Sequence, residues 1–214
     1  MNLSLSGSKP LVVLCLGCHS DDIEIGCGGT ILRLIEQQQN CRFCWVVFSA
    51  IGARKAEAQR AAKLFVGSER LEYLLLKKFR DGFMPFEGSA IKAVFEKLKK
   101  TISPDVIFTH CRTDAHQDHR LLSELTWNTF RHHLILEYEI PKYDGDLGQP
   151  NFYVPLKKEI YQKKIRNLMD GFATQRSKHW FTNETFLALM RLRGMECVAP
   201  SGYAEAFYCR KLVV

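Results

Sequence analysis

The sequence predicts an α/β fold, a Rossmann-like three-layer αβα sandwich around a mainly parallel sheet. Two observations carry this prediction. The segment Pro10–Gly17 is a continuous apolar, β-branched run, which is typical of a strand that is covered on both faces. Runs of this kind then alternate along the chain with segments of helical periodicity, and this alternation indicates βαβ units.

The first half of the chain alternates regularly between strand and helix. After the Pro10–Gly17 strand we expect a loop containing Gly26, Gly28 and Gly29, and then a helix over Thr30–Gln39. The elements expected next are a strand at Cys41–Ala50, a helix at Lys55–Phe65, a strand at Arg70–Lys78, a helix at Ser89–Ile102, a strand at Asp105–His110 and a helix at Asp118–His133. Such a chain is expected to take the doubly wound strand order 3-2-1-4.

The second half is less regular. The segment Pro141–Pro155 contains several prolines and glycines and is expected to be a loop, long enough to serve as a substrate lid. Helices are expected at Leu156–Phe172 and Asn183–Arg193, and a late edge strand at Tyr203–Arg210. We expect residues 1–214 to form a single domain, because no linker, repeat or low-complexity tract divides them.

Length, composition and charge exclude several classes of protein. The 214 residues are 46% hydrophobic and 25% charged, which is ordinary globular usage and excludes a disordered chain, collagen or a coiled coil. The net charge is +7, but the basic residues are scattered and form no recognised nucleic-acid motif, so no nucleic-acid partner is expected. The apolar run Leu11–Leu16 is far shorter than the ~20 residues of a spanning helix, and it lacks the flanks of a secretory signal. We therefore expect a cytoplasmic protein without a membrane span.

The eight cysteines form a misleading pattern. Cys15 and Cys18 make one CxxC pair, and Cys41 and Cys44 make another, which is the spacing of a zinc ribbon. However, Cys15 and Cys44 lie in strand-like runs, where residues i and i+3 point to opposite faces and cannot converge on one metal. Buried free thiols are expected instead.

Two short stretches combine histidine with carboxylate. His19-Ser20-Asp21-Asp22 directly follows the first expected strand, and His116-Gln117-Asp118-His119 comes soon after the fourth. Imidazole and carboxylate are ligands of catalytic zinc, which has three protein ligands and one open position. In the order 3-2-1-4, strands 1 and 4 are neighbours, and ligands bind at their carboxyl ends. The two stretches are therefore expected to meet in one metal site at the carboxyl ends of strands 1 and 4.

With these motifs the chain resembles the LmbE/PIG-L family of zinc-dependent N-deacetylases. The resemblance rests on H-x-D-D and H-x-D-H in this order. Weaker supporting pieces are Gly26-Cys27-Gly28-Gly29-Thr30, Arg54…Glu57, Asp81-Gly82, Pro104-Asp105 and Ala204-Glu205-Ala206-Phe207. Ser20 and Gln117 stand where the family often has Pro, and neither position is a ligand in the family. The His-x-Ser-Gln stretch of many members is replaced here by residues 171–175, Gly-Phe-Ala-Thr-Gln.

The resemblance implies a centre with one metal ion per chain. By position its ligands are His19, Asp22 and His119, with Zn²⁺ as the expected ion and Fe²⁺ or Co²⁺ as the alternative. Asp21 then resembles the general base that takes a proton from the metal-bound water. This chemistry suits an amide, because zinc lowers the pKa of bound water to about 7 and polarises the carbonyl. A carboxylate beside it can accept the proton and return it to the leaving amine.

Four further residues resemble the family's catalytic and substrate positions. His116 resembles the imidazolium that stabilises the oxyanion, and Asp118 the group that orients it. Arg54 and Asp81 resemble residues that contact the substrate. The expected function is removal of the N-acetyl group from a small amino-sugar conjugate. A phosphate-bearing conjugate is expected over a neutral oligosaccharide, since Arg54 and the basic net charge favour an anion.

Two other functions stay open. A metal-dependent phosphoesterase also uses His and Asp clusters, although a two-metal site needs more ligands than the two motifs offer. A non-catalytic sugar- or nucleotide-binding module would not need Asp21 beside the ligands. The motifs GxGxxG, P-loop and GxSxG are absent from the sequence, which disfavours dinucleotide binding, NTPase activity and serine hydrolysis. A homo-oligomer is compatible with the sequence, which does not name the sugar.

Overall fold

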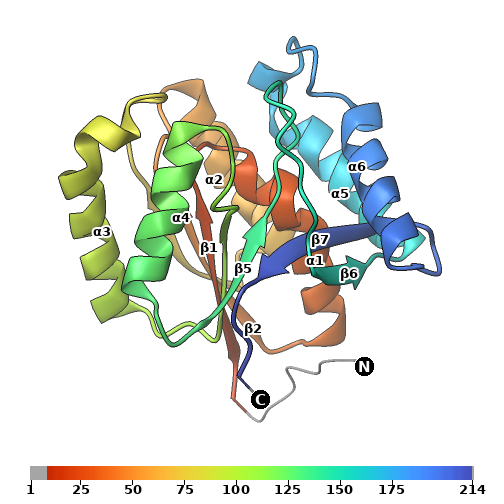
Figure 1. Ribbon diagram of the computed structural model, residues 1–214, viewed down its shortest axis with the longest axis horizontal. Coiled ribbons are helices and arrows are strands. Elements are labelled where there is room, and N and C mark those ends of the chain that lie inside the picture. Colours follow the sequence, from red (N-terminus) through yellow and green to blue (C-terminus); the bar gives the residue numbers. More distant parts are fainter. Residues whose placement is uncertain (1–8, 214) are drawn as a thin grey trace.

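The structure is a computed structural model that describes residues 9–213 (Figure 1). A seven-stranded sheet with the order β3-β2-β1-β4-β5-β7-β6 runs through its middle. The strands are β1 (Leu11–Gly17), β2 (Cys41–Val47), β3 (Leu71–Leu76), β4 (Val106–His110), β5 (Leu134–Tyr138), β6 (Phe152–Pro155) and β7 (Ala204–Cys209). β1 to β5 run parallel, and β7 is antiparallel to both β5 and β6. The predicted mainly parallel sheet and its 3-2-1-4 core are confirmed.

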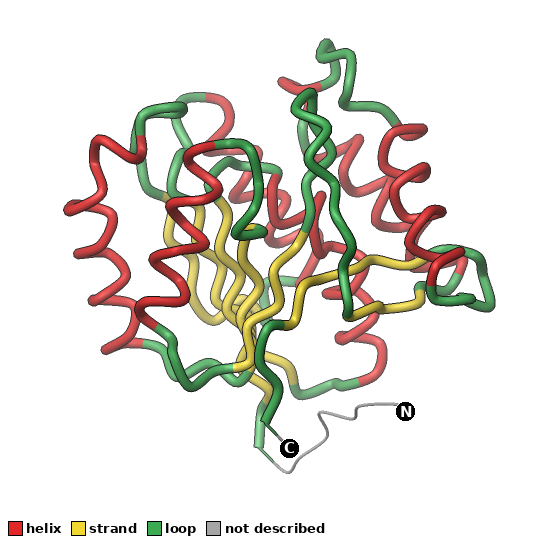
Figure 2. The backbone as a smooth tube through the Cα atoms, in the orientation of Figure 1, coloured by secondary structure: helices red, strands yellow, loops and turns green. Residues whose placement is uncertain are grey.

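Helices cover both faces of the sheet (Figure 2). One face carries α1 (Asp22–Gln37), α2 (Ala53–Val66), α5 (Lys158–Gly171) and α6 (Asn183–Glu196). The other carries α3 (Gly88–Thr101) and α4 (Gln117–Thr129), with the 3₁₀ turn η1 (Met84–Glu87) leading into α3. A second 3₁₀ turn, η2 (Ala173–Gln175), follows α5. The three-layer αβα sandwich is therefore confirmed. Within residues 9–213, no helix combines the length and apolarity that crossing a membrane would require.

Burial of the central strands on both faces explains why their sequences do not alternate between apolar and polar residues. Residues of β1 pack alternately into the two apolar layers, for example Val13 and Cys15 into one and Leu14 and Leu16 into the other. All four of these side chains are fully buried. A strand covered by helices on both faces needs apolar residues on both, so its sequence reads as a continuous apolar run.

Helix α1 begins at Asp22, directly inside the first motif, whereas a loop and then a helix from Thr30 had been predicted. The glycines that suggested this loop lie inside the helix: Gly26, Gly28 and Gly29. A Cβ atom at these positions would lie 2.2, 2.5 and 2.6 Å, respectively, from a neighbouring side chain. Glycine costs about 1 kcal/mol relative to Ala inside a helix. Close packing of α1 against its neighbours therefore explains why glycine stands at these positions.

Replacing Gly26 by Ala is expected to lower the melting temperature, although Ala is the better helix former. The added Cβ would lie 2.2 Å from the ring of Tyr138, which is fully buried. Overpacking a core costs about 1–3 kcal/mol, more than the about 1 kcal/mol that Ala gains in a helix. The matched control is Gly88→Ala in α3, where a Cβ meets nothing within 4 Å. In thermal unfolding, the melting temperature of Gly26→Ala should lie below that of the wild type, and that of Gly88→Ala should be equal to it or higher. The reverse order would contradict this explanation.

The C-terminal part departs from the prediction at three strands. β5 was not predicted, and β6 lies inside the segment 141–155, which had been expected to be loop throughout. The predicted late strand exists as β7, but it lies between β5 and β6, so β6 is the edge strand. The prediction of an edge position was therefore wrong. β6 has only four residues, and its pairing with β7 joins segments remote in sequence, which a local pattern does not reveal.

Candidate metal centre

The two motifs meet at one end of the sheet. The first lies between β1 and α1, and the second leads from the loop after β4 into α4 (Figure 1). β1 and β4 are paired in parallel, so the segments that follow them share one crevice. This is the switch point that the strand order predicted.

Three donor atoms of these motifs converge. His19 Nδ1 lies 3.3 Å from Asp22 Oδ2, His119 Nε2 lies 3.6 Å from the same oxygen, and the two nitrogens are 3.2 Å apart. A tetrahedral zinc with bonds of about 2.0–2.2 Å holds its ligands roughly 3.3–3.6 Å from one another. All three side chains are buried. The donor types and their spacing therefore fit a divalent ion.

A carboxylate engages the outer nitrogen of each histidine. Asp81 Oδ1 lies 2.9 Å from His19 Nε2, and Asp114 Oδ2 lies 3.0 Å from His119 Nδ1. Such partners fix the tautomer and the orientation of metal-binding histidines. When His19 Nε2 and His119 Nδ1 donate to these carboxylates, the other two nitrogens, His19 Nδ1 and His119 Nε2, carry lone pairs that face and repel each other. A cation between them relieves this repulsion. Asp81, expected to contact substrate, thus also orients a candidate ligand.

The surrounding charges favour a cation at this position. Burial disfavours protonation of His19, but the carboxylates of Asp22, Asp118 and Asp81 raise its pKa well above the ordinary value. Burial also disfavours the charged form of Asp22, yet the neighbouring histidines, His119 foremost, hold the pKa of this carboxyl well below its usual range. The cluster therefore stabilises an ionised carboxylate and a positive charge together.

Asp21 has one engaged oxygen and one free oxygen. Its Oδ1 accepts a hydrogen bond from Arg54 Nη2 at 2.7 Å, while its buried Oδ2 has no partner among residues 9–213. Burial raises the pKa of Asp21, and the Arg54 guanidinium opposes this rise. A buried carboxylate with a raised pKa and a free oxygen suits a group that accepts and returns a proton. Arg54, expected to bind substrate, is therefore also the ion-pair partner of Asp21.

His116 is oriented by the start of α4. Its Nδ1 accepts from the backbone N–H of Asp118 at 3.2 Å, which leaves the ring proton on Nε2. Burial and the neighbouring His119 lower the pKa of His116, so the geometry favours a neutral Nε2–H donor over the imidazolium that the resemblance implied. The Asp118 carboxylate accepts from the backbone N–H groups of Gly82 and Met84, at 2.7 and 3.2 Å. Asp118 thus contacts His116 through its backbone and holds the turn after β3 through its side chain.

Three buried residues that lie next to the candidate ligands were not predicted. Asp114 orients His119, and the ring of His110 stacks on His119 with centroids 3.8 Å apart. Cys18 offers a sulfur to the same cluster. A signal existed for each: Asp114 stands two residues before His116, and Cys18 and His110 stand at the carboxyl ends of neighbouring strands.

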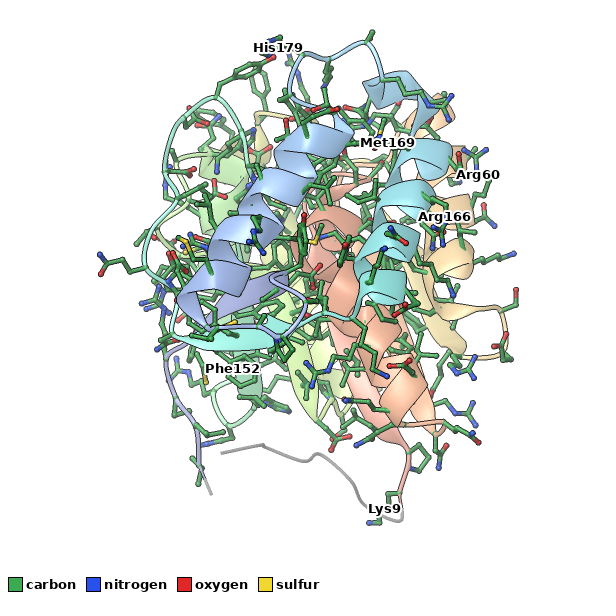
Figure 3. The ribbon with its side chains drawn as sticks, turned by 90° about the vertical axis from the view of Figure 1, so that its right-hand side faces the viewer. Lys9, Arg60, Phe152, Arg166, Met169 and His179 are labelled. Carbon is green, nitrogen blue, oxygen red and sulfur yellow. The ribbon has the colours of Figure 1, made fainter. Side chains whose placement is uncertain are left out.

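A pocket of about 200 Å³ opens above the candidate ligands. One wall comes from residues 140–144, of which 141–144 belong to the segment predicted as a lid, and includes Tyr143 and Asp144. The opposite wall comes from the connection between α5 and α6, with Gln175, Lys178 and Trp180. Figure 3 shows α5 and α6 side by side, with His179 in their connection at one end of the molecule. The sequence prediction contained no residue of this second wall.

The second wall is anchored to helix α2. The buried Glu57 accepts hydrogen bonds from the backbone N–H of Thr174 at 2.8 Å and from its hydroxyl at 2.6 Å. Glu57 lies one turn after Arg54 on α2, and Arg54 holds Asp21. One helix therefore contacts both the carboxylate of Asp21 and a wall of the pocket.

Fold and site together define a doubly wound α/β protein with a candidate His/Asp metal centre at its switch point. Residues 14–130 match the PIG-L family, described as GlcNAc-PI de-N-acetylase. The match spans more than half of the sequence, and the chain belongs to the PIG-L family, as the motifs predicted.

Individual relatives add to this assignment. The Escherichia coli K12 protein YaiS, described as an uncharacterized deacetylase, is 28% identical in an alignment of 176 residues that covers 76% of this chain and 91% of the relative. The structure of N,N′-diacetylchitobiose deacetylase from Pyrococcus horikoshii matches with a TM-score of 0.72 and 19% identity, over 92% of this chain and 82% of that one. The 4-carboxy-2-hydroxymuconate hydratase GalB from Pseudomonas putida KT2440 matches with a TM-score of 0.73 and 16% identity, over 95% and 98%. The family and the curated relative support N-deacetylase activity, whereas the fold alone does not select a reaction.

Proposed function

We propose that the protein is a metal-dependent hydrolase that removes the N-acetyl group from a small amino-sugar conjugate. The observation that carries the proposal is the buried Oδ2 of Asp21, which has no hydrogen-bond partner in the part of the chain that the structure describes. It lies beside the convergent donors of His19, Asp22 and His119. Amide hydrolysis needs both a proton acceptor and electrostatic help for the carbonyl oxygen, and this arrangement supports both needs. Membership in the PIG-L family supports the same reaction.

Each group near the centre has a distinct part in the proposal. His19, Asp22 and His119 hold the ion, for which Zn²⁺ is the expected choice. When bound, zinc lowers the pKa of water to about 7 and polarises the substrate carbonyl. Asp21 accepts a proton at Oδ2 and returns it to the leaving amine. His116 donates from Nε2 to the oxygen on which negative charge develops.

His116→Ala is expected to lower kcat by roughly 10²–10³-fold, the effect of losing one oxyanion donor. KM should change less, because the developing charge exists only in the transition state. His116→Gln, which keeps an N–H donor, should retain more activity than the Ala variant, and the metal content of both should match the wild type. A change confined to KM would instead assign His116 to substrate binding.

The walls of the pocket suit a sugar conjugate that carries an anion. Tyr143 and Trp180 offer flat faces to a sugar ring, and Asp144 and Gln175 offer hydrogen bonds to its hydroxyls. Arg54 is engaged with Asp21, whereas within residues 9–213 Lys178 forms no ion pair with a carboxylate. We therefore assign the contact with a phosphate group to Lys178. Residues 141–151, the part of the expected lid that precedes β6, act as the substrate lid.

Acetate release by metal-replete protein, measured across a panel of GlcNAc conjugates, tests this function. A nucleotide-linked GlcNAc is expected to give a higher kcat/KM than chitobiose. Lys178→Ala should reduce only the value for the nucleotide sugar, by severalfold, since an exposed ion pair contributes up to about 1 kcal/mol. Arg54→Ala should reduce both values together, because it disturbs Asp21. Release of phosphate without acetate would show that the protein is a phosphoesterase and not a deacetylase. A preference for chitobiose would contradict the proposal that the substrate carries an anionic group.

A further inference from the structure

Behind the proposed catalytic ligands lies a second set of metal-binding side chains. It consists of Cys18, Asp22, His110 and His119, whose ligand atoms all lie within 4.8 Å of one another. All four residues are buried, and Cys18 and His110 are fully inaccessible. Asp22 and His119 belong to both sets, whereas Cys18 and His110 belong only to this inner set. His19 belongs only to the outer one.

His110 is held in the tautomer that a metal ligand requires. The backbone N–H of Cys18 donates to its Nε2 at 3.0 Å, so Nε2 carries the lone pair and Nδ1 carries the proton. That Nδ1 is buried without a hydrogen-bond partner in the described part of the chain, which is an unfavourable state for a polar group. The Nε2 lone pair also lies 3.2 Å from the carboxylate oxygen Oδ2 of Asp22. Two acceptors this close repel each other unless a positive charge lies between them.

We propose that the inner set binds a soft divalent cation, such as Cd²⁺, in competition with the catalytic ion. Thiolate ligands favour soft metals over hard ones. On binding, the Cys18 thiol releases its proton to solvent and its sulfur forms the metal bond, while the ion takes over the Nε2 lone pair of His110 from the Cys18 N–H.

Occupation of the inner set inactivates the enzyme for two reasons. Four protein ligands close the coordination sphere, so no position remains for water, whereas a catalytic site keeps one position open. Asp22 and His119 also cannot serve both positions at once, so an ion at the inner set displaces the ion at the outer set. A thiophilic metal would therefore block hydrolysis without competing with substrate.

Ultraviolet titration of the full chain with Cd²⁺ tests the inner set directly, because cadmium–thiolate bonds give a charge-transfer absorption. The wild type should develop this band and saturate at one equivalent per chain. Cys18→Ala and Cys18→Ser should lose it. The matched control is Cys27→Ala, since Cys27 is equally buried but its sulfur donates to the Ile23 carbonyl at 3.2 Å and lies outside the set. This variant should keep the band.

A second comparison separates the inner set from the catalytic ligands. His19→Ala removes a ligand of the outer set only, so it should lose acetate release with Zn²⁺ but keep the cadmium band. Cys18→Ala should show the opposite behaviour, with Zn²⁺-supported hydrolysis retained and resistant to added Cd²⁺. The proposal is overturned if the wild type shows no band, if Cys18→Ala keeps it, or if His19→Ala loses it as well. The last result would make Cys18 a further ligand of the catalytic ion.

Discussion

Replacing His119 by Ala is expected to yield a protein that has lost most of its metal and all measurable turnover. His119 supplies one of the three proposed ligands of the catalytic ion, and its Nε2 lies 3.2 Å from His19 Nδ1 and 3.6 Å from Asp22 Oδ2. The substitution also leaves the Asp114 carboxylate without the ring that it orients. Metal analysis by inductively coupled plasma mass spectrometry, on variant and wild type prepared side by side, measures the loss.

The control for this variant is His133→Ala. His133 follows α4 at the opposite end of that helix, beyond the last turn, and packs edge-on against Phe130. Its removal should leave one ion per chain. Full metal occupancy in His119→Ala would show that the proposed ligand set is wrong, whatever the remaining activity of the variant.

Asp21→Asn is expected to keep the metal and to lose at least about 10²-fold in turnover, the usual effect of removing a general base. The amide has the size of the carboxylate and still offers an oxygen to Arg54, so the surrounding geometry is preserved. What it lacks is an oxygen that can take up a proton at neutral pH. Acetate release in single-turnover experiments, together with metal analysis, separates this chemical effect from loss of the ion.

Asp144→Asn is the matched control for the loss of a carboxylate in the same pocket. Asp144 lines the outer wall and is exposed, whereas Asp21 is buried next to the ligands. The Asp144 variant should change KM more than kcat. Nearly normal acetate release by Asp21→Asn would remove Asp21 from the mechanism.

Local sequence patterns sufficed for β1 to β4, four of the five parallel strands. Strands such as Leu11–Gly17 are covered on both faces and therefore appear as continuous apolar runs. The predicted start of α1 was wrong because its glycines, among them Gly26, were interpreted as loop residues on account of their conformational freedom. In the structure they provide room for rings such as that of Tyr138. The place of β7 depends on its partners β5 and β6, and no property of its own residues specifies that place.

The sequence predicted the proposed ligands of the candidate site better than the contacts that hold them in place. The residues proposed as ligands could be found because short motifs and strand order bring His19 and His119 together. Their partner Asp114 was missed, because it stands outside both motifs and contributes through a contact with one ring. Arg54 was noticed, but its contact with Asp21 at 2.7 Å follows only from the way α2 lies against the first motif.

The double attachment of α2 has a consequence for exchanging specificity between relatives. Arg54 and Glu57 tie this helix to Asp21 on one side and to Thr174 on the other. If the segment 172–182 were replaced by that of another family member, its residues would no longer match the carboxylate of Glu57. The poor fit would displace α2 and, through Arg54, would disturb the orientation of Asp21. Grafts that carry the first turns of α2 together with this segment should therefore remain active where grafts of the segment alone fail, so the unit of modular exchange in this enzyme is discontinuous in sequence.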